Sequence, residues 1–313
     1  MTGIVLEAKG LVKRFGDLTA VNDLSLAVQQ GEILGFLGPN GAGKTTTINM
    51  LCGICCPDAG SVTINSEPMA GNTARIRSRL GVCPQEVVIW QNLTCSEQLI
   101  FMAHMYSVDP TTARNRSQKL LSDLNLEGKS NKLARTLSGG MKRRLNLALA
   151  LIHDPEILIL DEPEAGLDPQ SRVLVRDYIR ALAPRKTVIL TTHNMDEADR
   201  LSDRVAVIDH GRLLVLDTPE ALKHRVGSGD VLEISLCEED GNKARIALLA
   251  FGDRISLEMF NNTLLIRGLD IVSVLPDILN SLKSGGIECR EVHLRQNTLE
   301  DVFIQLTGRR LRE

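Results

Sequence analysis

One glycine-rich stretch, residues 38–46, constrains the fold of this chain more than any other part of the sequence. Its spacing is G-x-x-x-x-G-K-T, and its members are Gly38, Pro39, Asn40, Gly41, Ala42, Gly43, Lys44, Thr45 and Thr46. The apolar run before it, residues 32–37, predicts a buried strand, and residues 45–51 predict a helix. Strand, glycine-rich loop and helix in this order are the context that a phosphate-binding loop requires.

The residue types in this loop suit a chain of phosphates. Glycines allow backbone N–H groups to turn inward around the phosphates, where a Cβ atom would clash. The N-terminus of the following helix adds partial positive charge at the same place. Lys44 can reach the β- and γ-phosphates, and the Thr45 hydroxyl can ligate Mg²⁺. The alternative is a glycine-rich turn with an exposed lysine, and the spacing and context favour the phosphate loop.

Composition narrows the class of protein. The 313 residues suffice for one large domain with a small one, or for two medium domains, and 43% hydrophobic residues can form a sizeable core. A net charge of −3 argues against attraction of the whole surface to nucleic acid. Aromatic residues make up only 3%, so stacking platforms for single strands are not expected.

Cysteine usage and hydropathy indicate where such a chain works. Seven cysteines without a framework spacing predict a reduced, cytosolic protein. Cys52, Cys55 and Cys56 cluster where the first helix should end, which favours small buried side chains over a metal or redox site. We see no signal-peptide pattern and no apolar run of about 20 residues. We therefore expect a soluble chain, or one bound to a membrane through a partner.

Alternating apolar strands and helices predict an α/β fold with a mostly parallel core sheet, preceded by antiparallel N-terminal strands. A helical insert of about residues 86–154 interrupts it. Two continuous apolar runs, residues 157–160 and 187–190, predict buried parallel strands.

Polar side chains follow these two strands at the edge where ligands bind in open α/β sheets. Asp161 and Glu162 come after the first strand, and adjacent carboxylates there suit Mg²⁺ and a water to be activated. His193 follows the second strand and is predicted at the same edge as Lys44. A lone histidine is more often a hydrogen-bonded core residue.

A second potential anion site precedes the long helix that runs to Ile152. Ser138, Gly139 and Gly140 would lie at its N-terminus, although this triplet is also a common helix cap. The basic run that follows, residues 142–144, is predicted to form a solvated face.

Beyond a glycine-serine joint at residues 227–229, the pattern predicts a small second domain. It reads strand, helix, strand, strand, helix, strand, over residues 231–236, 243–250, 255–259, 263–267, 271–284 and 287–294, with a last helix over 298–306. This is the split βαβ, or ferredoxin-like, arrangement. We expect a nucleotide-binding domain over 1–228 and a regulatory or docking α+β domain over 229–313. The basic end, residues 309–312, is predicted to be a solvated tail, with contact to acidic lipid as the alternative.

In order and spacing, these motifs resemble an ATP-binding-cassette (ABC) transporter ATPase subunit over residues 4 to about 225. The matching motifs are Phe15, residues 38–46, Gln85, residues 137–141, Asp161-Glu162, residues 166–168 and His193. Residues 298–308 resemble the tail of the daunorubicin-resistance-type exporter branch. The resemblance implies a P-loop NTPase (RecA-like) core.

The resemblance also implies roles in one nucleotide pocket. Phe15 would stack on adenine, residues 38–44 would hold the phosphates with Lys44 among them, and Thr45 would ligate Mg²⁺ with support from Thr46. Opposite the loop, Asp161 would orient Mg²⁺.

Three further residues would act on the reaction itself. Gln85 would sense Mg²⁺ and the attacking water and couple the site to a membrane partner. Glu162 would act as a base or polarise the water, and His193 would contact the γ-phosphate.

Two motifs would act across a dimer. Ser138, Gly139 and Gly140 would bind the γ-phosphate of the nucleotide held by the opposite subunit, and Asp168 would link the two sites. The sequence departs from the family pattern at Glu164, commonly Thr, at Met141, commonly Gln, and in having Phe15 for the commoner Tyr. Glu164 places another negative charge near the region of the hydrolytic water.

We therefore expect an ATPase subunit that uses ATP and Mg²⁺ and powers export of a drug-like, lipid or polysaccharide cargo. Its partners would be a separate membrane permease and a second ATPase subunit, expected to be another copy of this chain, at the cytoplasmic face of the membrane. One alternative is a soluble ABC ATPase acting on nucleic acid or ribosomes. A single cassette, the lack of long heptads and the lack of a strongly basic domain argue against it. Another is an interaction module in which ATP is only a structural ligand.

Overall fold

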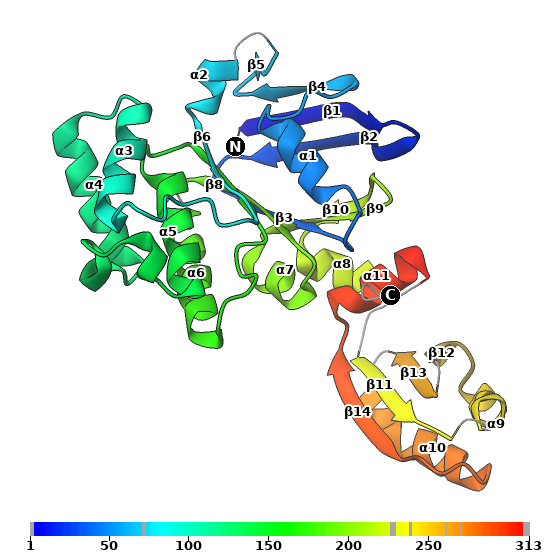
Figure 1. The fold of residues 1–313 in the computed structure, drawn as a ribbon. Helices are drawn as coiled ribbons and strands as arrows, with labels where there is room; N and C mark the ends of the chain where they lie inside the picture. The colour runs from blue at the N-terminus through cyan, green and yellow to red at the C-terminus, as the bar shows by residue number, and fades with distance from the viewer. Residues whose placement is uncertain are drawn as a thin grey trace. The chain divides into compact units, whose positions relative to one another are not determined.

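The computed structural model describes residues 3–70, 73–183, 185–225, 230–237, 240–260, 262–268 and 271–308 (Figure 1). The chain divides into two compact units, Met1–Thr218 and Pro219–Leu311. The predicted joint at 227–229, with the predicted boundary inside it, and the basic end at 309–312 lie outside the described residues.

The first unit is built on a six-stranded sheet with the order β10-β9-β3-β8-β7-β6. These strands span Arg212–Asp217, Arg204–Asp209, Ile33–Leu37, Thr187–Thr192, Ile157–Asp161 and Leu80–Cys83, respectively. Every neighbouring pair is parallel except β9 and β10. The three central strands are buried along their whole length, as expected for continuous apolar runs covered on both faces. The predicted mostly parallel core sheet is confirmed.

A second sheet of the same unit is antiparallel, with the order β2-β1-β4-β5. Its strands span Leu18–Gln29, Ile4–Phe15, Ala59–Ile64 and Glu67–Pro68. In β2, Leu24, Leu26 and Val28 are buried while Ser25 between them is exposed, so one face packs on a core. Helix α1 (Lys44–Leu51) contributes Ile48, Met50 and Leu51 to the same core.

The helical insert contains α3 (Cys95–Met105), α4 (Pro110–Asp123) and α5 (Gly139–Leu151), gathered beside β6 in Figure 1. Thr94 begins α3 with a capping box that Glu97 completes, and Asp109 caps α4. The remaining longer helices of the unit are α6 (Pro169–Leu182) and α7 (Met195–Leu201).

The basic run at the start of α5 corrects the sequence interpretation. Arg143 and Arg144 are buried, although a solvated face was predicted. Arg144 Nη1 donates to the carbonyl oxygen of Leu124 at 2.8 Å, just past the end of α4. Carbonyl groups at a helix end have no partner within the helix, and a buried guanidinium can satisfy several of them.

The second unit has a four-stranded antiparallel sheet with the order β12-β13-β11-β14. The strands are β11 (Asp230–Ser235), β12 (Ile255–Phe260), β13 (Thr263–Gly268) and β14 (Glu291–Gln296), with helices α8 (Pro219–Arg225), α9 (Gly241–Ala247), α10 (Ile271–Ser284) and α11 (Leu299–Thr307). This confirms the ferredoxin-like arrangement. The last strand begins at Glu291, later than the predicted 287, because Ile287 packs into the core beneath the sheet instead.

Helix α11 is anchored by a buried carboxylate. Thr298 and Asp301 form a capping box at the start of this helix, and Arg295 Nη1 donates to Asp301 Oδ2 at 2.6 Å. Burial raises the pKa of Asp301, but hydrogen bonds from Arg295 and the Thr298 backbone overcome this and lower the pKa to about 2.

None of the helices within the described ranges is both long and apolar enough to cross a bilayer.

Candidate functional site

The glycine-rich loop joins β3 to α1, and two of its glycines admit no other residue. Gly43 has φ of +97°, and a Cβ there would lie 2.4 Å from the carbonyl oxygen of Ala20. A Cβ on Gly38 would lie 2.2 Å from the carbonyl oxygen of Ile208. At these two positions the loop backbone therefore lies against β9 and β2, with no space for a side chain. Between them, Asn40 and Gly41 are exposed, while Ala42 is buried.

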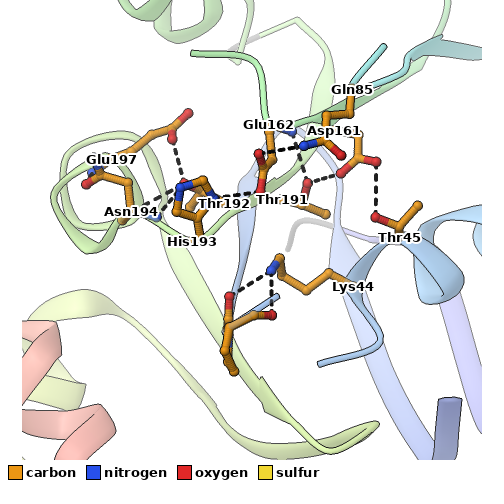
Figure 2. A network of polar contacts seen from close by, with 12 residues as sticks. Lys44, Thr45, Gln85, Asp161, Glu162, Thr191, Thr192, His193, Asn194 and Glu197 are labelled. Carbon is orange, nitrogen blue, oxygen red and sulfur yellow. Dashed lines mark hydrogen bonds and ion pairs between the residues drawn. The ribbon is translucent and has the colours of Figure 1, made fainter. Parts of the chain in front are cut away.

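Lys44, the first residue of α1, folds back over the loop. Its ammonium group donates to the carbonyl oxygens of Gly38 and Pro39 at 2.7 and 2.9 Å (Figure 2). Burial lowers the pKa of Lys44, and the nearby carboxylates of Glu162 and Asp161 oppose that shift. A cation thus lies inside the loop, where a phosphate chain would need one.

Asp161 ends β7 directly opposite the loop. Its Oδ2 accepts from the Thr45 hydroxyl at 3.3 Å, and its Oδ1 accepts from the hydroxyl of Thr191 (Figure 2). The parallel register pairs Asp161 with Thr191 on the adjacent strand β8, so both side chains reach the same edge. Thr46 lies next to Thr45 on α1 and is half-buried. Thr191 is part of this group, although no local pattern distinguishes it from the other threonines in the sequence.

Glu162 follows with an unusual backbone, since its φ of +49° lies in the left-handed region. Its Oε1 is 2.7 Å from His193 Nδ1, and its Oε2 accepts from Gln85 Nε2 at 3.0 Å (Figure 2). Its backbone N–H donates to the Thr191 hydroxyl at 3.0 Å. The carboxylate is nearly buried, whereas the His193 side chain is 54% exposed. Three side chains that follow the ends of β6, β7 and β8 are thus joined at one edge of the sheet.

Glu164 does not leave an uncompensated charge near this edge. The carboxylate is buried, and Arg176 of α6 donates to its two oxygens at 2.8 and 2.7 Å. This paired geometry neutralises the charge that the sequence departure introduces.

Glu197 is a second buried carboxylate close to the site. Its Oε2 accepts from the Thr192 hydroxyl at 2.6 Å, and Thr192 precedes His193 (Figure 2). Burial raises the pKa of Glu197 to about 7. The carboxylates of Glu164 and Glu162 act in the same direction, while the Thr192 bond and Arg176 act against it.

This shift predicts a pH-dependent stability. Between its ordinary value of 4.5 and about 7, Glu197 holds a proton in the folded chain that the unfolded chain releases. Glu197 therefore stabilises the folded chain fully below pH 4.5, and this stabilisation is lost as the pH rises through about 7. At about 1.4 kcal/mol per pKa unit the loss is on the order of 3 kcal/mol. Glu197→Gln cannot ionise, so we expect it to exceed the parent chain in stability at about pH 8 and to match it at about pH 5.

Urea unfolding across this pH range checks the expectation. Glu220→Gln, at an exposed position on α8, is the control and should follow the parent curve. Parallel curves for Glu197→Gln and the parent chain would show that Glu197 is ionised throughout.

The remaining sequence motifs form a separate group. Ser138 caps α5 by accepting from the backbone N–H of Met141, and Asp168 caps α6 by accepting from that of Ser171. A Cβ on Gly140 would lie 3.4 Å from Asp168 Oδ2, so the two helix starts are adjacent. Ser138, Gly139 and Asp168 are exposed. Within the described residues, no hydrogen bond or ion pair joins this group to the phosphate loop.

Phe15 lies at the end of β1, with 54% of its surface exposed. The Lys13 ammonium lies 5.5 Å from the centre of its ring and is held by Asp58 Oδ1 at 2.9 Å. An exposed ring supported by a cation is compatible with stacking of a base. Within the described part of the chain, no hydrogen bond, ion pair or ring contact joins Phe15 to the phosphate loop.

The cysteine cluster lies at the end of α1. Cys52 is buried, which raises the pKa of its thiol to about 12, whereas Cys55 is half-buried and Cys56 exposed. Among the described residues, no three His, Cys, Asp or Glu side chains converge as a metal site.

Arg143, like Thr191, is a residue of the site that was not predicted from the sequence. From α5 its guanidinium reaches the backbone of both Gln85 and Glu162, with Nη1 to Gln85 O at 2.8 Å and Nη2 to Glu162 O at 2.6 Å. Its neighbour Lys142 is half-buried. No local pattern distinguishes the three basic residues, because their acceptors come from distant strands.

The chain is similar in sequence and in fold to several known proteins. A family model described as ABC transporter matches residues 21–165. Nod factor export ATP-binding protein I of Ralstonia nicotianae is 40% identical over 311 residues, which cover 99% of this chain and 95% of the relative. Daunorubicin resistance ATP-binding protein DrrA3 of Streptomyces coeruleorubidus is 36% identical over 316 residues, covering 100% and 99%. A solved ATP binding subunit of an ABC transporter superposes with a TM-score of 0.66 at 27% identity, over 71% of this chain and 92% of that one.

Proposed function

The chain belongs to the ABC transporter family of ATP-binding proteins, and from this membership we propose that it hydrolyses ATP to drive export through a separate membrane permease. The observation that carries the proposal is the Glu162 carboxylate, held between Gln85 and His193 at the sheet edge beside the phosphate loop. A relative named for Nod factor export and one named for daunorubicin resistance support export. The cargo would be of the drug-like, lipid or polysaccharide kind.

ATP binding uses the loop and the start of α1. The triphosphate lies against the loop N–H groups and the α1 N-terminus, and Lys44 exchanges its carbonyl contacts for phosphate oxygens. Thr45 and Asp161 offer one hydroxyl and one carboxylate on adjacent elements, which fits Mg²⁺ because that ion takes few protein ligands besides phosphate and water. Gln85 is the further candidate ligand. The ion would neutralise charge on the phosphates.

Hydrolysis requires a base for the attacking water. The water oxygen forms a bond to the γ-phosphorus while the Glu162 carboxylate accepts a proton from that water. The bond between the γ-phosphorus and the oxygen that bridges it to the β-phosphate breaks at the same time. Gln85 and His193 keep the carboxylate oriented. The His193 side chain is 54% exposed, and we propose that it also contacts the γ-phosphate.

The exposed group at the starts of α5 and α6 supports a two-subunit site. Ser138, Gly139 and Gly140 offer the N-terminus of a 13-residue helix, which attracts anions. We place the γ-phosphate of a second copy's nucleotide there, with Asp168 between the two sites. Closure of two copies around ATP would complete the charge cradle and exclude water.

An apolar surface on the helical insert supports permease docking. Val87, Val88 and Trp90 lie a few residues after Gln85 in the sequence and are exposed. Trp90 packs edge-on against the exposed Phe101 of α3, with ring centres 5.3 Å apart. Exposed apolar clusters of this kind mark interaction sites. This cluster is close in sequence to Gln85, which binds the Glu162 carboxylate. The chain would therefore work at the cytoplasmic face of a membrane.

Copurification tests the permease partner. A tagged Glu162→Gln chain, expressed in its native cell and extracted gently with ATP, should recover a multi-span membrane protein. Trp90→Ala should lower that recovery about tenfold, because aromatic anchors carry much of the binding energy of an interface. Ile54→Ala, an exposed apolar residue outside the insert, is the control. Recovery of ribosomes or nucleic acid instead would support the soluble alternative and overturn the transporter assignment.

A further inference from the structure

We propose that Arg143 is a positioning residue that holds the backbone of Glu162 in its left-handed conformation and ties it to the Gln85 segment. The inference rests on the proposed role of Glu162 in hydrolysis. It concerns a side chain that, within the described ranges, forms no hydrogen bond or ion pair with the phosphate loop or with a carboxylate. Arg143 acts on the reaction through the main chain of Gln85 and Glu162.

The hydrogen bonds of Arg143 are unusual in number and kind. A guanidinium has five N–H donors, and this one makes five contacts, all to backbone carbonyl oxygens. Two are at the end of β6, to Pro84 at 2.6 Å and Gln85 at 2.8 Å. Three are at the end of β7 and just after it, to Asp161 at 2.7 Å, Glu162 at 2.6 Å and, at a longer 3.4 Å, Pro163.

These contacts bracket the one strained residue of the site. Glu162 is not glycine, so a φ of +49° costs free energy that the surroundings must offset. Arg143 binds the carbonyl groups on both sides of that residue, and Thr191 binds its N–H. The peptide units before and after Glu162 are thereby fixed, and the side chain points to Gln85 and His193.

Because Arg143 is buried, the loss of any of these hydrogen bonds would cost free energy. Only 4% of its surface is exposed, so each N–H that loses its carbonyl would remain without a partner. A lysine offers three donors from one point and cannot span two strands as a planar fork does. Arg143 also stands one turn after Ser138 on α5, so the helix proposed to contact the second copy's nucleotide also holds the base of its own site.

Arg143→Lys and Arg143→Gln test the inference in the full-length chain. We expect kcat to fall between about 10- and 100-fold, since small misplacements of a catalytic group have effects of this size. The KM for ATP and direct ATP binding should change less than about threefold, because the loop is untouched. Leu147→Ala, buried one turn further along α5, is the matched control. It should lower Tm as the Arg143 variants do, yet keep kcat within about threefold at temperatures well below Tm.

A double-mutant cycle separates positioning from general destabilisation. If Arg143 acts through Glu162, Arg143→Lys should leave the residual rate of the Glu162→Gln chain unchanged within about twofold. An equal loss in both backgrounds, or an unchanged kcat in the parent background, would overturn the inference. Full hydrolysis by Glu162→Gln alone would instead refute the proposed role of Glu162, so the two failures are distinguishable. If Arg143→Lys does not fold, Arg143→Gln is carried through the same cycle.

Discussion

Glu162→Gln is expected to lower kcat for ATP hydrolysis by between about 100- and 10,000-fold, the range that general base catalysis contributes. Gln keeps the size of Glu162 and can still pair with Gln85 and His193, so the site should retain its shape. ATP binding should persist, because the phosphate loop and Lys44 are unchanged. The variant should therefore accumulate as an ATP-bound dimer, seen by size-exclusion chromatography with and without Mg²⁺-ATP.

Glu164→Gln makes the same chemical change two residues further along the chain. The Glu164 carboxylate is paired with Arg176 rather than with Gln85 or His193, so we expect hydrolysis within about threefold of the parent rate and a lower Tm. Rapid hydrolysis by Glu162→Gln would remove Glu162 as the base. A large loss in both variants would instead indicate that the total negative charge of this loop controls the rate.

Mixing two inactive variants should restore hydrolysis if the site is shared between two copies. Lys44→Ala removes the cation inside the loop, and Ser138→Arg places a large side chain at the exposed start of α5. Each alone should lose at least about 100-fold in rate, by analogy with removal of one stabilising group around a developing charge. In a mixed dimer both lesions fall in one site, and the other site combines an intact loop with an intact Ser138.

Random mixing makes half of the dimers mixed, each with one working site, so we expect roughly a quarter of the parent rate if the sites act independently. The control is Lys44→Ala mixed with Glu162→Gln, which places one lesion in each site and should stay inactive. No recovery in the first mixture, with dimers demonstrated by cross-linking, would mean that each copy completes its own site or that one site cannot act alone.

Much of the fold could be predicted because the local signals are strong and consistent with one another. Continuous apolar runs predict the buried strands β7 and β8, and period-2 alternation predicts β2. The glycines at 38 and 43 are demanded by backbone contacts at β9 and β2. The alternation of elements then predicts a parallel sheet, whose common edge brings Lys44, Asp161, Glu162 and His193 together.

The second unit was predictable for the same reason. Its six core elements appear in the predicted order. Helix α9 (Gly241–Ala247) differs from the predicted 243–250 by a few residues, and β14 begins later than predicted because Ile287 packs in the core without being part of the strand. The apolar residues before β14 do not indicate where the strand begins, because its first residue is set by pairing with β11.

Local patterns in the sequence suffice to predict the phosphate loop, the order of strands and helices, and the polar residues at the sheet edge. How the buried polar groups find their hydrogen-bond partners depends on the folded chain. Arg143 was predicted on a solvated face and Glu164 as an added charge near the hydrolytic water. Both are buried, one among five carbonyl groups and the other against Arg176. The pKa of Glu197 likewise depends on burial and on charges brought from other elements. Hydrophobic period and glycine requirements act within a few residues, whereas desolvation and hydrogen-bond partners are set by segments far apart in the chain.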